Sequence, residues 1–101
     1  MKLVGKLKLK EFSNAHHGAK KPLDRWCSVV EHADWHKFAD VKKTFGNADW
    51  YGKDNKGYVI FNIGGNKYRV IAAINFKGLI VVVKVILTHK EYDKDKWKEA
   101  L

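Results

Sequence analysis

The chain has 101 residues and a mass of 11.7 kDa, and 46% of its residues are hydrophobic. A chain of this size and composition can bury one core, so we expect a single domain over residues 1–101. Its one cysteine excludes an internal disulfide and a multi-cysteine zinc site. The longest apolar run, residues 79–83, is too short to span a membrane, and no signal peptide is recognisable. We therefore expect a cytoplasmic protein.

The formal net charge of +9 is concentrated in two parts of the chain. Residues 1–22 hold six lysines and one glutamate, and residues 55–90 hold six cations and no carboxylate. A long stretch without acidic residues produces a positive field that suits a polyanion such as nucleic acid. A solubilising lysine surface explains the excess in residues 1–22 equally well.

The first half of the chain predicts a short strand followed by helices. We expect the strand at residues 2–4 and a helix from about Lys6 to His17, ended near Gly18 because glycine favours a helix C-terminus. The clearest helix covers residues 22–33, where Pro22 suits the first helical position. One face of this helix carries five apolar residues at helical spacing: Leu23, Trp26, Cys27, Val30 and Ala33. One or two helical turns over residues 38–45 and an edge strand at 48–51 complete this half.

From Tyr58 onward the apolar residues alternate, which predicts strands. Residues 58–63 and 66–76 form a hairpin around a two-residue Gly64–Gly65 turn with positive φ at both positions. In the second strand one face is apolar, and the other carries Lys67, Arg69 and Asn75. Residues 79–87 predict a central strand buried on both faces, interrupted by Lys84.

The last predicted element is a helix that begins at Thr88. Thr88 and Glu91 have the spacing of a capping box, and Leu87 and Tyr92 that of a hydrophobic staple. Trp97 gives this helix an apolar side as far as the end of the chain. The predicted fold class is therefore α+β, with a small antiparallel sheet of three to four strands, two N-terminal helices and a short C-terminal helix.

Two segments of the chain match a known family. Residues 58–76, YVIFNIGGNKYRVIAAINF, followed by THKEYD at 88–93, resemble the HigB family of toxins from bacterial type II toxin–antitoxin systems, within the RelE/ParE superfamily. The match is close over residues 58–93 and coarse over the first half. The resemblance implies a RelE-like fold and a metal-independent endoribonuclease that cuts mRNA, usually on the ribosome. It also implies a cognate HigA-like antitoxin with a helix-turn-helix.

Metal-free RNA cleavage needs a base for the 2′-hydroxyl, cations for the charge on phosphorus and an acid for the departing oxygen. Two-metal cleavage would need converging carboxylates, which residues 55–90 lack, so we expect no metal and no cofactor. His32 and His36 have helical metal-pair spacing, but no third ligand accompanies them. The expected catalytic residues are Arg69, His89 and Tyr92, and the expected RNA- or phosphate-binding residues are Lys67, Lys84 and Lys90.

Each of these residues also has a structural interpretation. Arg69 suits an ordinary surface position, Lys84 suits a side chain that reaches solvent past the sheet, and His89 suits a structural role at the helix start. Tyr92 serves equally as the staple partner of Leu87. We expect neither Arg69 nor His89 to be a core residue. We also expect the free N–H groups in the first turn of the last helix to favour an anion.

The residues leave two other functions open. One is a basic module without catalytic activity that binds RNA or the ribosome. The other is a ParE-like toxin that acts on a protein target. Mapping of RNA ends separates the three functions, because only an endoribonuclease creates new internal 5′ ends.

Overall fold

The computed structural model describes residues 1–53 and 56–101. The carboxylate-free stretch begins at Asn55, which lies outside the described residues. Within the described part, strands and helices alternate at the start of the chain and a run of strands follows. The elements are β1 (Lys2–Val4), α1 (Lys6–Ala15), a 3-10 turn η1 (His17–Ala19), α2 (Lys20–His32), α3 (Phe38–Thr44), β2 (Asp49–Lys53), β3 (Lys56–Ile63), β4 (Tyr68–Asn75), β5 (Ile80–Thr88), α4 (His89–Asp93) and a 3-10 helix η2 (Lys96–Ala100).

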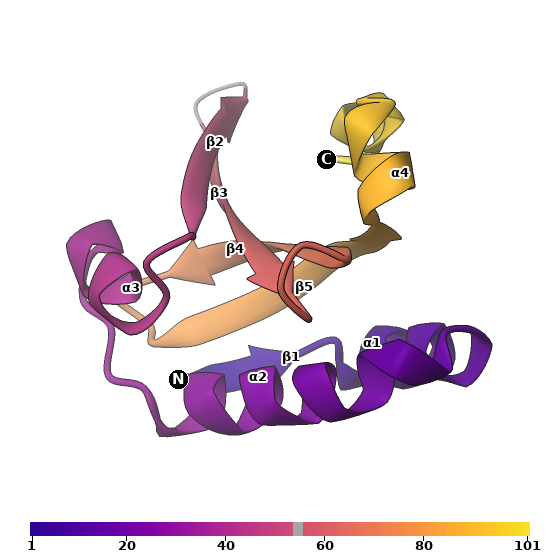
Figure 1. The fold of residues 1–101 in the computed structure, drawn as a ribbon. Helices are drawn as coiled ribbons and strands as arrows, with labels where there is room; N and C mark the ends of the chain where they lie inside the picture. The colour runs from indigo at the N-terminus through magenta and orange to yellow at the C-terminus, as the bar shows by residue number, and fades with distance from the viewer. Residues whose placement is uncertain (54–55) are drawn as a thin grey trace.

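The strands form one five-stranded sheet in the order β1-β5-β4-β3-β2. Strands β2 to β5 are antiparallel, whereas β1 pairs with β5 in parallel, with Leu3 opposite Val81 (Figure 1). The α+β fold class is confirmed. The sheet has five strands rather than three to four, because the short N-terminal strand joins it beside β5 instead of standing alone.

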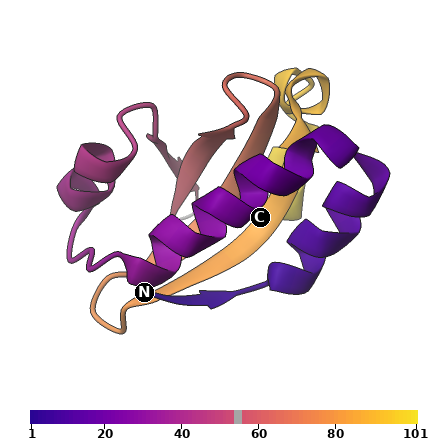
Figure 2. The same cartoon turned by 60° about the horizontal axis from the view of Figure 1, so that its bottom comes forward.

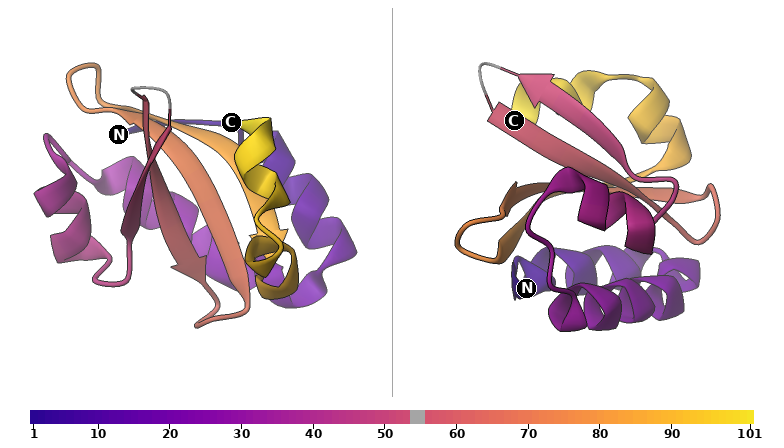
Figure 3. Two further views of the ribbon diagram at one scale, coloured as in Figure 1. Left: turned by 90° about the horizontal axis from the view of Figure 1, so that it is seen from above. Right: turned by 90° about the vertical axis from the view of Figure 1, so that its left-hand side faces the viewer.

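Two layers cover the sheet. Helices α1 and α2 lie side by side across one face (Figure 2). The C-terminal segment with α4 and η2 lies on the opposite face (Figure 3, right). Each layer encloses its own apolar cluster: Trp26, Phe61, Val70 and Val81 belong to the helix side, and Ile60, Ile71 and Trp97 to the C-terminal side. Burying each of these side chains contributes about 1.5–3 kcal/mol. The C-terminal cluster therefore fixes the position of α4 on the sheet.

The N-terminal helices begin and end near the predicted positions. Helix α1 ends at Ala15 rather than His17, and α2 begins at Lys20, two residues before the predicted start at Pro22. Pro22 is tolerated as the third residue of α2, because the first four N–H groups of a helix have no partner within it. None of the helices in the described residues combines the length and apolar character needed to cross a membrane.

The hairpin between β3 and β4 differs from the prediction. Gly64 and Gly65 have positive φ values of 63° and 72°, as expected. The connection spans four residues, however, because Ile63 pairs with Tyr68 and leaves residues 64–67 outside the ladder. The backbone carbonyls of Asn66 and Lys67 bond instead to Arg69 and to the first residue of α4. The connection is thus part of the candidate site described below.

The last helix is shorter than predicted. It ends at Asp93, and Asp95 takes a left-handed conformation with φ 61° before η2 begins. This break turns the chain back, so that Trp97 packs against the sheet with 5% of its surface exposed.

The face of β4 opposite the helices is less polar than predicted. Ile71 is fully buried there and packs in the same cluster as Trp97. The polar residues on this face of β4, Arg69 and Asn75, therefore lie near opposite ends of the strand.

Candidate active site

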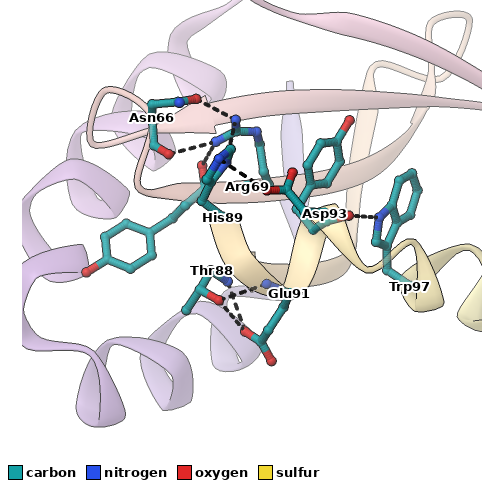
Figure 4. Close-up of polar contacts among 9 residues, drawn as sticks. Asn66, Arg69, Thr88, His89, Glu91, Asp93 and Trp97 are labelled. Atoms are coloured by element: carbon teal, nitrogen blue, oxygen red, sulfur yellow. Dashed lines mark hydrogen bonds and ion pairs between the residues drawn. The ribbon is translucent and has the colours of Figure 1, made fainter.

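Arg69 is the second residue of β4, and 6% of its surface is exposed. Its Nη1 donates to the carbonyl oxygens of Asn66 (3.2 Å) and Tyr68 (3.1 Å). Its Nη2 donates to the side-chain oxygen of Asn66 and to Nδ1 of His89 at 3.2 Å (Figure 4). The expectation that Arg69 lies outside the core is wrong, because the 64–67 connection and α4 enclose the guanidinium.

The acceptors around the Arg69 guanidinium are all neutral. In the part of the chain that the structure describes, no carboxylate forms an ion pair with it. A cation withdrawn from water without a counter-charge is costly for the folded protein. Its planar fork is also the group best suited to hold a phosphate at two points. This position therefore has the electrostatics of an anion site.

His89, the first residue of α4, lies between Arg69 and Asp93. Its Nδ1 accepts the hydrogen bond from Arg69, and its Nε2 lies 3.3 Å from a carboxylate oxygen of Asp93. The backbone N–H of His89 donates to the carbonyl of Lys67 at 2.8 Å, which ties α4 to the 64–67 connection. The side chain of His89 is 45% exposed, so a ligand in solvent can reach it.

Tyr92 lies on the other side of Arg69. The guanidinium carbon is 5.1 Å from the centroid of the Tyr92 ring, a cation–π arrangement. Burial raises the pKa of the Tyr92 hydroxyl above its ordinary value, although the nearby Arg69 acts in the opposite direction. The hydroxyl therefore keeps its proton at neutral pH and is available as a proton donor.

The predicted capping box is confirmed at the start of α4. The Thr88 hydroxyl accepts from the N–H of Glu91 at 3.2 Å, and the Glu91 carboxylate accepts from the N–H of Thr88 at 2.9 Å. This last bond lowers the pKa of Glu91. In the first turn of α4 the N–H groups of His89 and Glu91 already have partners, so the predicted anion contact there would fall to the N–H of Lys90.

The predicted lysines are distributed unevenly around Arg69. Lys67 and Lys90 are exposed and lie next to the site in the chain. Lys67 follows Asn66, and Lys90 follows His89. Lys84 is not beside Arg69, because Leu87 pairs with Arg69 and Lys84 lies at the β-bulge opposite Ile71 and Ala72. The extra residue of the bulge explains how this charge reaches solvent from a central strand.

Two contacts of the site were not predicted. Asn66 supplies two acceptors to Arg69, and Asp93 pairs with His89. Asp93 has a signal in the sequence, because it lies four residues after His89 in a predicted helix and so shares its face. Nothing in the sequence indicated a role for Asn66, because it was predicted to be the first residue of a strand.

Other candidate features lie elsewhere. His32 is the last residue of α2 and bonds to the Ser28 carbonyl, whereas His36 pairs with Asp34, so the two histidines do not act as a helical pair. A groove of about 700 Å³ separates α1 from α2 on the other face of the sheet. None of Arg69, His89 and Tyr92 lines it.

Comparison with known proteins gives concordant matches. The family model described as HigB toxin, RelE-like toxic component of a toxin–antitoxin system, matches residues 19–95. The mRNA interferase HigB of Escherichia coli O6:H1 is 33% identical over 94 residues, which cover 93% of this chain and 90% of that protein. The mRNA interferase toxin HigB of Escherichia coli K12 and the mRNA interferase HigB of Shigella flexneri are each 30% identical over 93 residues, covering 92% of this chain and 88% of theirs.

Proposed function

Because the chain belongs to the HigB toxin family, the RelE-like toxic components of toxin–antitoxin systems, we propose that it is an endoribonuclease that cuts mRNA. In this reaction the 2′-hydroxyl of the RNA attacks the adjacent phosphorus atom, and the bond to the 5′-oxygen breaks. The products are a 2′,3′-cyclic phosphate and a 5′-hydroxyl. Catalysis requires a group that holds the phosphate and groups that move two protons.

Arg69, His89 and Tyr92 supply these groups within one contact network. Arg69 holds the phosphate and stabilises the negative charge that develops on it. His89 and Tyr92 carry the proton transfers, one at the attacking and one at the departing oxygen. Since the reaction needs no further group, we propose that it proceeds without a metal ion.

The observation that carries this proposal is the buried Arg69 guanidinium, which contacts an imidazole and an aromatic ring but is paired with no carboxylate among the described residues. Structural arginines that are buried to this degree are usually neutralised by an acid. An RNA phosphate would provide the missing charge. Exposed Lys67 and Lys90, which flank the network, would extend the contact to neighbouring phosphates.

The partners follow from the same proposal. The substrate is mRNA, bound while it is translated on the ribosome, in the cytoplasm. A HigA-like antitoxin with a helix-turn-helix holds the toxin inactive. Lys84 lies three residues before Leu87, the β5 partner of Arg69, and would contact RNA outside the cleavage position.

Mapping of RNA 5′ ends after brief expression tests the proposed function. We expect new internal 5′ ends in mRNA with the wild type and none with His89→Ala, at equal protein levels. His17→Ala is the matched control, because His17 is an exposed histidine of η1 outside the network. Growth arrest with intact RNA would favour a protein target, and intact RNA without toxicity would favour a binding module.

A further inference from the structure

Both ring nitrogens of His89 have partners in the described structure. A guanidinium only donates hydrogen bonds, so the contact from Arg69 Nη2 at 3.2 Å requires an unprotonated Nδ1. The single proton of the neutral ring is then on Nε2, which faces the Asp93 carboxylate at 3.3 Å. Arg69 and Asp93 thus select the same tautomer from opposite sides of the ring (Figure 4).

The hydrogen bonds of Arg69 indicate which acceptor a phosphate would displace from the guanidinium. Its two terminal nitrogens donate to four neutral acceptors: the Asn66 carbonyl, the Asn66 side chain, the Tyr68 carbonyl and His89 Nδ1. An anion that approaches the fork must replace at least one of them. The carbonyls of Asn66 and Tyr68 are held by the backbone next to Arg69, so the acceptors free to move are the two side-chain groups bonded to Nη2, Asn66 Oδ1 and His89 Nδ1. Of these two, His89 Nδ1 makes the longer contact with Nη2, at 3.2 Å, and is therefore the acceptor most easily given up.

We infer that Asp93 is a positioning residue for His89, and that phosphate binding at Arg69 frees His89 Nδ1 to act as the base. This inference rests on the proposed function. When Arg69 turns its Nη2 to the phosphate, Nδ1 loses its donor and takes the proton of the 2′-hydroxyl. The 2′-oxygen then bonds to phosphorus, and the 5′-oxygen leaves with a proton from the Tyr92 hydroxyl. The His89 proton returns to Tyr92 through solvent, which restores both residues.

Asp93 acts on the imidazole of His89 and does not contact the substrate. Its carboxylate keeps the proton on Nε2 and stabilises the imidazolium that forms after Nδ1 accepts a proton. Asp93 is the last residue of α4, one turn after His89, so the capped helix fixes the distance between them. Its side chain is 61% exposed, so substitution there does not disturb the core.

Nitrogen-15 NMR of the ligand-free protein tests the first part, with the His89 signals assigned by comparison with His89→Gln. At about pH 8, where an ordinary imidazole is neutral, we expect His89 to carry its proton on Nε2 alone. Asp93→Asn should shift His89 towards a mixture of tautomers, because an amide can either donate or accept. Asp95→Asn, a matched aspartate that pairs with Lys98, should leave the His89 signals unchanged. A proton on Nδ1 in the wild type would overturn the inference.

Titration with a thymidine dinucleotide tests the coupling, because this probe has a phosphate but no 2′-hydroxyl to react. We expect the His89 Nδ1 signal to move on binding in the wild type. Binding that leaves Nδ1 unchanged would show that Arg69 does not release it, and would contradict the inference.

Rates of RNA cleavage distinguish a positioning role of Asp93 from a purely structural one. Asp93→Asn should lower kcat about 10- to 100-fold with KM unchanged, less than the 10²- to 10⁴-fold expected for loss of the base itself. Asp95→Asn should keep wild-type kcat. An Asp93→Asn variant with wild-type kcat would overturn the positioning role. A wild type that cuts no RNA would instead overturn the proposed function, and the NMR result would still decide the role of Asp93.

Discussion

The indole of Trp97 holds Tyr92 through two contacts. Its Nε1 donates to the Tyr92 carbonyl at 3.0 Å, and the two rings stack with centroids 5.3 Å apart. Tyr51 of the edge strand β2 packs against Trp97 in a T-shaped arrangement, with the ring centroids 5.2 Å apart. The Tyr92 ring that contacts Arg69 is thus the last of three packed rings, the first of which lies on the edge strand β2. The C-terminal segment is therefore a structural part of the candidate site.

Trp97→Ala should weaken both stability and RNA cleavage. Loss of a buried tryptophan costs about 3–5 kcal/mol, and Tyr92 loses its support. Trp97→Phe keeps a ring for stacking but loses the hydrogen bond and part of the buried surface, so it should be less destabilised than Trp97→Ala. Urea unfolding and cleavage rates measure the two effects. Equal cleavage by Trp97→Ala and the wild type would show that Tyr92 needs no support.

Arg69→Lys should abolish most RNA cleavage while retaining the positive charge, because an ammonium cannot hold a phosphate with a two-point fork. Arg69→Ala removes both the charge and the fork, so it should also abolish cleavage. Arg25→Ala, at an exposed position on α2, is the control and should behave as the wild type. Cleavage rates at matched folded concentrations decide the outcome. An active Arg69→Lys variant would contradict the fork geometry.

The capping box predicts a pH dependence of stability. Its hydrogen bond lowers the pKa of Glu91 in the folded protein. The stabilisation is therefore fully present above the unfolded value of about 4.3 and is lost as the pH falls below it towards the folded pKa. Glu91→Gln keeps a side-chain acceptor but does not titrate, so its stability should change less between about pH 7 and pH 3 than that of the wild type.

Urea unfolding at the two pH values measures this difference. Glu99→Gln, an exposed carboxylate in η2, is the control and should retain the pH dependence of the wild type. Identical pH profiles for Glu91→Gln and the wild type would show that the cap does not titrate with folding. Thr88→Ala removes the cap and should cost about 1 kcal/mol at either pH.

Binding to single-stranded RNA should depend strongly on salt. Neutralisation of about five phosphates predicts a log–log slope of about −3.5, at about −0.7 for each phosphate. The single variants Lys67→Gln and Lys90→Gln should each make this slope less negative. Affinities of the His89→Ala variant, which binds without cutting, give the measurement. A slope near zero would show that the basic residues do not touch phosphate.

The features that could be predicted from the sequence are those set by residues close together in the chain. The alternating residues of β3 and β4, the capping box at Thr88 and the family resemblance over residues 58–93 are all confirmed. These features depend on neighbours in the chain, where side-chain spacing decides the outcome.

The features that the sequence did not reveal depend on distant contacts. Arg69 has the pattern of a surface residue, and it is buried because the 64–67 connection and α4 close around it. The bulge that displaces Lys84 from Arg69 is a property of strand pairing and has no signal in β5 alone. Asn66 joins the site because it lies in the four-residue connection outside the ladder, where it bonds to Arg69.

The chemistry of the cut ends tests the central claim most directly. Purified protein is incubated with a translated mRNA, and with a single-stranded RNA in EDTA, and the ends of the fragments are analysed. We expect 2′,3′-cyclic phosphate and 5′-hydroxyl ends in the translated mRNA, the same ends on any RNA that is cut in EDTA, and no fragments with His89→Ala. Fragments with 5′-phosphate ends, or cleavage that requires one specific transition metal, would contradict the mechanism assigned to Arg69, His89 and Tyr92.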